Sequence, residues 1–151
     1  LEPFGEGKIY PHEQTMSGPK EDRLKLYRAT GFNLSPVFGL YPDPDGEVAK
    51  VIDPFTLKNP PTVAKDHLGV TNRLWVITDS HAISTLIGLM GPKPVYIADG
   101  HHRYETGVKY LEERRAAGEV PDSESPANFT LMMLVGMTDP GLVILPTHRL
   151  V

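Results

Sequence analysis

The sequence predicts an α/β (α+β) domain, with helices packed on a mixed, mainly antiparallel sheet. Three observations lead to this prediction. Short apolar runs such as Val95 to Ala98 end at glycine or proline turns, which is typical of strands. Segments with the 3.6-residue period of a helix follow directly, as in 101–117. The turn signal Thr138-Asp139-Pro140-Gly141 lies between two apolar runs, as in a hairpin.

Glycine and proline mark the elements of the first part of the chain. We expect an edge strand or loop over 1–18, a helix over 19–30, a strand over 37–41 and a segment without a clear pattern over 47–61. Pro19 suits the first helical position, and Gly31 suits the position after a helix end. Asp53-Pro54 and Pro60-Pro61 interrupt the last of these segments, so the sequence leaves its structure open.

The second part of the chain predicts alternating strands and helices. We expect a hairpin over 62–67 and 73–78, a helix over 81–90, a strand over 95–98, a helix over 101–117 and strands over 129–135 and 142–145. Asp79 or Ser80 can cap the first of these helices. Tyr104, Val108 and Leu111 recur at i, i+4 and i+7, so they predict the core face of the second helix.

Length and composition set the class of protein. The 151 residues predict a single domain, and 40% hydrophobic residues are enough for a core. A net charge of −4 argues against nucleic-acid binding and against an anionic membrane surface. There is no cysteine and no apolar run of membrane-spanning length, so we expect a cytoplasmic protein. Because the chain begins at Leu1 and stops at Val151 within an apolar run, we expect it to be the middle fragment of a longer protein.

The junction between the strand over 95–98 and the following helix predicts an anion site. Gly100 allows close backbone approach, and the start of a helix presents unpaired N–H groups and the positive end of its dipole. His102 and Arg103 fall in the first helical turn. An arginine fork beside a helix N-terminus is suited to phosphate.

Each residue of this junction also has a plainer interpretation. Asp99 can cap the helix, or it can orient a histidine, hold a metal–nucleotide complex or take a substrate proton. Arg103 can form a surface ion pair with Glu105 or a nearby acid instead of binding phosphate. Adjacent residues on a helix point about 100° apart, so His101 and His102 make a poor pair of ligands for one metal. No metal site is expected.

Two resemblances add to this interpretation. The segment Ala98-Asp99-Gly100-His101-His102-Arg103-Tyr104-Glu105-Thr106 resembles the phosphate-binding box of the ParB/sulfiredoxin superfamily, whose free-serine kinases carry Asp-Gly-His-His-Arg. The whole chain resembles the prokaryotic family called domain of unknown function 1015. The matching pieces are His12-Glu13-Gln14-Thr15, Gly18-Pro19-Lys20-Glu21-Asp22-Arg23, Asn33-Leu34-Ser35-Pro36-Val37-Phe38, Arg73-Leu74-Trp75, the box and Leu145-Pro146-Thr147-His148-Arg149.

The resemblance to the superfamily implies a nucleotide-binding domain. It is expected to be a phosphotransferase or nucleotide hydrolase that uses ATP, ADP or CTP with Mg²⁺ and a small hydroxyl substrate such as serine. The alternative is a nucleotide-sensing module without chemistry. The expected catalytic residues are Glu13 as base, Asp99 and His101; the expected nucleotide-binding residues are Gly100, His102, Arg103, Lys20 and Arg23. Glu13 can instead be a solvated loop acid, and Lys20 and Arg23 can belong to a solvated helix face with local charge pairs. We also expect Lys20 or Arg23 and His148 or Arg149 to approach the box.

Overall fold

The computed structural model describes residues 1–15 and 17–145, and its contacts group them into two compact units. One unit is Leu1–Pro42 with the chain from Pro94 onward, and the other is Asp43–Lys93. All the candidate site residues that the structure describes belong to the first unit. Whether the two units together form the single domain expected from the length stays a prediction.

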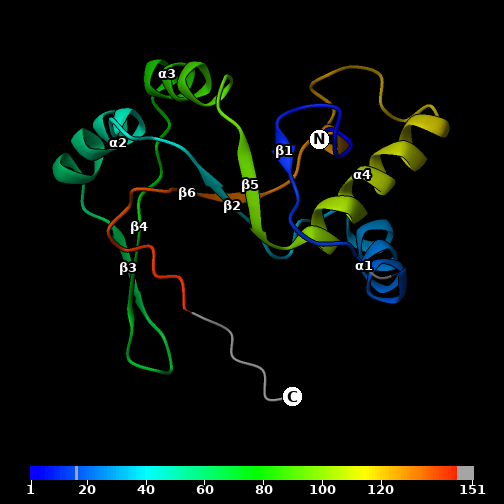
Figure 1. The fold of residues 1–151 in the computed structure, drawn as a ribbon, viewed down its shortest axis with the longest axis horizontal. Coiled ribbons are helices and arrows are strands. Elements are labelled where there is room, and N and C mark those ends of the chain that lie inside the picture. The colour runs from blue at the N-terminus through cyan, green and yellow to red at the C-terminus, as the bar shows by residue number, and fades with distance from the viewer. Residues whose placement is uncertain (16, 146–151) are drawn as a thin grey trace. The chain divides into compact units, whose positions relative to one another are not determined.

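A four-stranded mixed sheet organises the first unit (Figure 1). Its order is β1 (Ile9–Tyr10), β5 (Val95–Asp99), β2 (Val37–Tyr41) and β6 (Met132–Gly136). β1 runs parallel to β5, β2 runs antiparallel to β5, and β6 runs parallel to β2. The central strands alternate buried positions with less buried ones, because successive residues of a strand face opposite sides of the sheet. This arrangement places the carboxyl end of β5, and so the predicted anion site, beside the start of β2.

Two helices of this unit pack against each other, α1 (Ser17–Thr30) and α4 (His101–Ala116) (Figure 1). α1 ends at Gly31, whose φ of 67° is left-handed and whose N–H donates to the Tyr27 carbonyl at 2.8 Å. α4 buries Tyr104 and Leu111 and half-buries Val108, as its periodicity predicts. A short 3₁₀ helix, η1 (Pro126–Asn128), precedes β6. The core joins the sheet to α4 through three side chains, those of Val37, Ile97 and Tyr104.

The second unit contains α2 (Glu47–Lys58), the hairpin of β3 (Thr62–Lys65) and β4 (Thr71–Leu74), and α3 (Ser80–Met90). α2 and α3 pack against each other. Asp79 caps α3 by accepting the Ala82 N–H at 2.8 Å. Asp43 is buried, and its two carboxylate oxygens accept the N–H groups of Glu47 and Val48 at the start of α2.

The expected α+β fold with a mixed sheet is confirmed. Within the described part of the chain the four strand pairs divide equally between parallel and antiparallel. One local expectation is wrong, and one segment that the sequence left open is a helix. Residues 47–58 form α2 although Pro54 lies inside it, where proline removes one helical hydrogen bond and crowds the carbonyl four residues earlier; packing of the helix on α3 offsets this cost. Residues 142–145 form no strand; they are apolar enough for one, but they pair with no strand in the described ranges.

Candidate functional site

The turn from β5 into α4 is a tight strand-to-helix junction. Gly100 has a φ of 96°, a left-handed conformation that favours glycine. A Cβ atom at this position would lie 2.9 Å from the Arg103 Nε atom. The Tyr104 N–H donates to the Gly100 carbonyl at 3.0 Å, which closes the first helical turn. The predicted placement of Gly100 at a junction, with His101 in the first turn of a helix, is confirmed.

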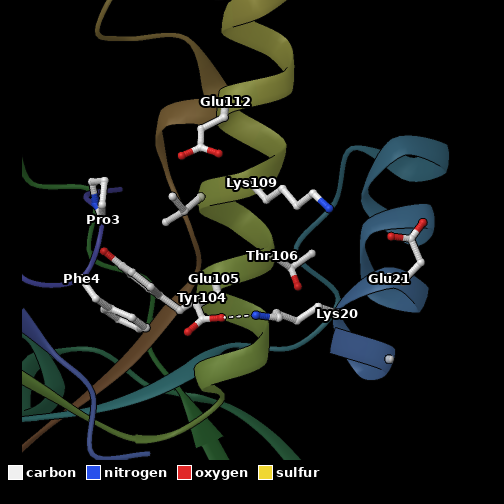
Figure 2. Close-up of a pocket in the computed structure, with 11 residues that line it drawn as sticks. Pro3, Phe4, Lys20, Glu21, Tyr104, Glu105, Thr106, Lys109 and Glu112 are labelled. Carbon is white, nitrogen blue, oxygen red and sulfur yellow. Dashed lines mark hydrogen bonds and ion pairs between the residues drawn. The ribbon is translucent and has the colours of Figure 1, made fainter. Parts of the chain in front are cut away.

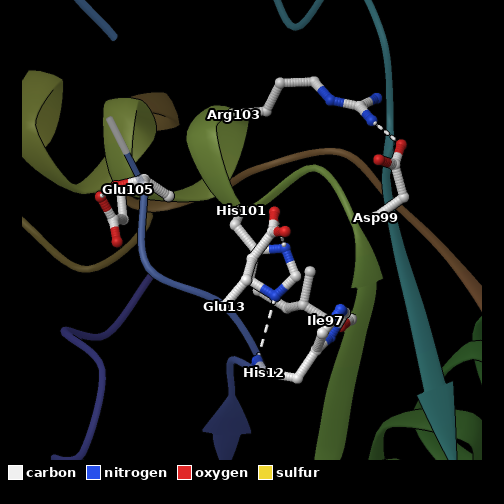
Figure 3. Close-up of polar contacts among 8 residues, drawn as sticks. His12, Glu13, Ile97, Asp99, His101, Arg103 and Glu105 are labelled. Carbon is white, nitrogen blue, oxygen red and sulfur yellow. Dashed lines mark hydrogen bonds and ion pairs between the residues drawn. The ribbon is translucent and has the colours of Figure 1, made fainter. Parts of the chain in front are cut away.

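Arg103 lies beside this junction, and its guanidinium group is already engaged (Figure 3). Nη2 forms an ion pair with the Asp99 carboxylate one turn earlier, at the end of β5. Nη1 donates to the Ser35 hydroxyl at 2.6 Å and to the Pro36 carbonyl. Arg103 therefore ties the segment before β2 to β5, and a phosphate group at this fork has to share it with Asp99.

The structure corrects the interpretation of Asp99 as the cap of α4. Gly100 is the N-cap of α4, and Asp99 is the last residue of β5, so Asp99 does not cap the helix. Its carboxylate is 73% exposed and pairs with Arg103. Arg103 pairs with a nearby acid, as its plainer interpretation allows, and that acid is Asp99 rather than Glu105. The two residues are four positions apart on either side of the turn at Gly100, so their separation in the sequence allowed this pair.

His101 is buried beneath the segment that follows β1 (Figure 3). Its side chain is 1% exposed, and the His12 N–H donates to its Nε2 at 3.2 Å. The other ring nitrogen, Nδ1, lies 3.0 Å from Glu13 Oε1, but the contact lacks the direction of a hydrogen bond. Burial lowers the pKa of His101, and the smaller opposing effect of Glu13 does not cancel it. We therefore treat His101 as a neutral ring at pH 7.

His12 is the residue of this site that the sequence interpretation missed. Its Nδ1 lies 2.8 Å from the Ile97 carbonyl, and its ring meets the His101 ring edge-on at a centroid distance of 4.5 Å. The sequence signalled only that a histidine precedes Glu13. The pairing of β1 with β5, which brings His12 to Ile97, is a long-range contact that no local pattern reveals.

Glu105 connects the start of α1 to α4 (Figure 2). Its Oε2 accepts from Lys20 Nζ at 2.8 Å and from the Thr15 hydroxyl. Burial alone would raise the pKa of Glu105, but these two donors, together with the Lys20 and His102 charges, outweigh burial and hold that pKa below its usual value. Lys20 thus approaches the box helix, as expected, through Glu105.

A cavity of about 670 Å³ opens beside this ion pair, between the N-terminal segment, α1 and α4 (Figure 2). The Phe4 and Tyr104 rings, stacked with centroids 5.0 Å apart, line one side of it. The lining also includes five charged side chains, those of Lys20, Glu21, Glu105, Lys109 and Glu112. The volume lies within the range of small-molecule pockets.

The remaining candidate residues lie on α1, on α4 and near the end of the chain. Arg23 is exposed on α1. His102 is half-buried, and its carbonyl accepts from the Thr106 hydroxyl at 2.5 Å. His148 and Arg149 lie outside the described residues, so their expected approach to the box stays a prediction.

The comparisons with known proteins give one result. A family model described as "Protein of unknown function (DUF1015)" matches residues 1–151. The chain belongs to the DUF1015 family. No curated protein and no solved structure matches it. Within the described residues of this DUF1015 protein, no helix combines the length and apolar character that crossing a membrane requires.

Proposed function

We propose that this DUF1015 domain binds a nucleotide through its phosphates at the N-terminus of α4 and transfers a phosphoryl group to a small hydroxyl substrate. The observation that carries the proposal is the meeting of Glu13 with the first residue of α4, at 3.0 Å between Glu13 Oε1 and His101 Nδ1. This contact brings a second acidic side chain, in addition to Asp99, to the start of α4. This is the segment that resembles a phosphate-binding box.

Each group has a role in this proposal. The α4 dipole, its first N–H groups and Arg103 hold the phosphates. Asp99 is 73% exposed and pairs with Arg103, so a nucleotide-bound Mg²⁺ that takes Asp99 would release the guanidinium for phosphate. Glu13 is 52% exposed and takes the proton of the substrate hydroxyl. Phosphoryl transfer depends on positioning and charge neutralisation, which these groups supply.

The part of the nucleotide other than its phosphates is proposed to bind in the cavity beside Lys20 and Glu105. The stacked Phe4 and Tyr104 rings offer an apolar wall, and the charged rim offers hydrogen-bond partners. Arg23 and His102 stay secondary candidates for phosphate contact. A cytoplasmic location, where nucleotides are available, belongs to the same proposal.

The second candidate is a nucleotide-sensing module without chemistry. The observation that favours it is the internal bonding of Arg103 to Ser35, Pro36 and Asp99. A ligand that displaced these bonds would release Ser35 and Pro36 from Arg103 and so change the conformation of the segment before β2. A ligand-dependent change of this kind can act as a conformational switch.

The two functions are separated by measuring binding and turnover on the same protein. We expect ATP, ADP or CTP with Mg²⁺, at 100 times its Kd, to raise the free energy of unfolding by about 2.7 kcal/mol. ³¹P NMR with serine and other small alcohols then reports transfer. Glu13→Gln should abolish turnover and keep binding, and Glu6→Gln, also exposed, is the matched control. Binding without any product supports the module, and the absence of nucleotide binding overturns both functions.

A further inference from the structure

We infer that His12 and Glu13 are direct ligands of a divalent transition-metal ion, with His101 as the buried group that orients Glu13. One donor atom from each of the three residues lies within 4.8 Å of the others (Figure 3). The biological role of the ion rests on the proposed function, since the cation would lie beside the proposed phosphate site. Its binding chemistry does not, because the ion can be titrated without nucleotide. Because the ion takes up the Glu13 carboxylate that serves as the base in the proposed function, the metal-bound form is a state separate from the phosphoryl-transfer reaction.

The hydrogen bond of His12 defines which of its nitrogens can bind a metal. A carbonyl oxygen only accepts, so the 2.8 Å contact with the Ile97 carbonyl places the proton of a neutral His12 ring on Nδ1. Nε2 then carries the lone pair. Metal-binding histidines commonly donate their other N–H to a backbone carbonyl, which fixes the tautomer and the ring orientation. His12 is exposed and already has this arrangement.

His101 is held in the complementary state. Its Nε2 accepts the His12 N–H at 3.2 Å, so the proton of the neutral ring is on Nδ1. That N–H is buried, lies 3.0 Å from Glu13 Oε1 and lacks a partner with hydrogen-bond geometry among the described residues. Buried N–H groups are rarely left in this condition. A Glu13 carboxylate held by a cation at one oxygen can turn the other toward this N–H.

The same proton assignment limits the number of protein ligands to two. While the His12 N–H occupies Nε2 of His101, the Nδ1 proton excludes His101 from direct metal binding. The remaining coordination positions are left for water or for phosphate oxygens. One imidazole nitrogen and one carboxylate oxygen suit Zn²⁺ or Mn²⁺ better than Mg²⁺, which prefers oxygen ligands alone.

The test is a Zn²⁺ titration of the 151-residue chain without nucleotide, followed by calorimetry and by ¹⁵N NMR of the histidine rings. We expect the Nε2 resonance of His12 to move to a metal-bound position while His101 keeps its Nδ1 proton. His12→Asn retains an N–H that can reach the Ile97 carbonyl and lacks the Nε2 ligand. This variant and Glu13→Gln should each lower the Zn²⁺ affinity at least about tenfold. His67→Ala, an exposed histidine of the other unit, should not change it.

Three results would overturn the inference. They are no Zn²⁺ binding by the wild type, unchanged affinity in either variant, and a metal-bound resonance at a ring nitrogen of any histidine other than His12. Circular dichroism of His12→Asn checks that a loss of affinity is not a loss of fold. Binding of inorganic phosphate measured in a chelator tests the α4 site separately, so a failed metal site and a failed phosphate site give different results.

Discussion

Lys20 Nζ lies 2.8 Å from Glu105 Oε2, and this ion pair joins the start of α1 to the first turns of α4. Both side chains are about one-third exposed or less. Thr15 adds a hydroxyl donor to the same oxygen. The pair therefore holds together one wall of the cavity beside the proposed nucleotide site. Because the pair requires a charged Glu105, the stability of this wall depends on the ionisation of that carboxylate.

The first prediction concerns pH. The pKa of Glu105 is lower in the folded chain than its ordinary 4.5, so the unfolded chain binds more protons in this range. The stabilisation is then fully present above pH 4.5 and is lost as the pH falls through the folded value. Urea unfolding should show that Glu105→Gln is less stable than the wild type by about 1 kcal/mol at pH 6, and that the difference shrinks toward pH 3. Glu112→Gln, exposed on the same helix, is the control; a constant difference for Glu105→Gln contradicts the prediction.

The second prediction concerns Tyr104, which is 1% exposed. Its hydroxyl donates to the Glu2 carbonyl at 2.8 Å and accepts the Glu2 N–H at 3.2 Å. Tyr104→Phe should cost about 1–2 kcal/mol because it leaves both backbone groups without this partner. Tyr104→Ala should cost about 3–5 kcal/mol because it also opens a cavity in the core. Chemical denaturation measures both, and equal costs for the two variants would show that the ring contributes nothing beyond its hydroxyl.

The third prediction concerns the unit formed by Asp43–Lys93. Asp43 caps α2 and lies 3.2 Å from Lys93 Nζ, so it joins the first residue of the unit to the last. Asp43→Ala should lower the stability of this unit by about 1 kcal/mol or more through the lost cap. Hydrogen exchange should quicken in α2 and α3 and stay unchanged in α4. Uniform quickening across both units would contradict this, and Asp45→Ala, exposed in the same turn, is the control.

The fold was predictable where local signals agree with packing. The Asp99-Gly100 turn between two different periodicities predicted the β5–α4 junction, and Tyr104 predicted the buried face of α4. α2 was missed because Pro54 is a strong local signal against a helix, while the packing that compensates is a tertiary contact. A strand over 142–145 was expected because apolar runs indicate strands, but the pattern does not say whether a partner is present.

The candidate site was predictable in part for the same reason. The sequence named Glu13, Asp99, His101 and Arg103, and the structure brings all four to the β5–α4 junction. It did not indicate that Arg103 bonds to Ser35 and Pro36, or that His12 bonds to the Ile97 carbonyl. Those contacts join segments far apart in the chain, and they depend on strand pairing that residue spacing does not reveal.

The last prediction tests whether the Arg103 fork serves a ligand or only the fold. Arg103→Ala should weaken binding of inorganic phosphate by about 1.5–3 kcal/mol, the scale of a charged hydrogen bond. It should also cost stability, because Ser35 and the Pro36 carbonyl lose a donor.

Asp99→Asn separates the effect on binding from the effect on stability, since Asp99 is 73% exposed and its ion pair adds little to stability. Removing its negative charge should free the guanidinium and tighten phosphate binding, as measured by calorimetry. Arg73→Ala, exposed on β4, is the control. If Asp99→Asn leaves phosphate affinity unchanged and Arg103→Ala changes only stability, Arg103 is a structural residue and the phosphate site at the start of α4 is wrong.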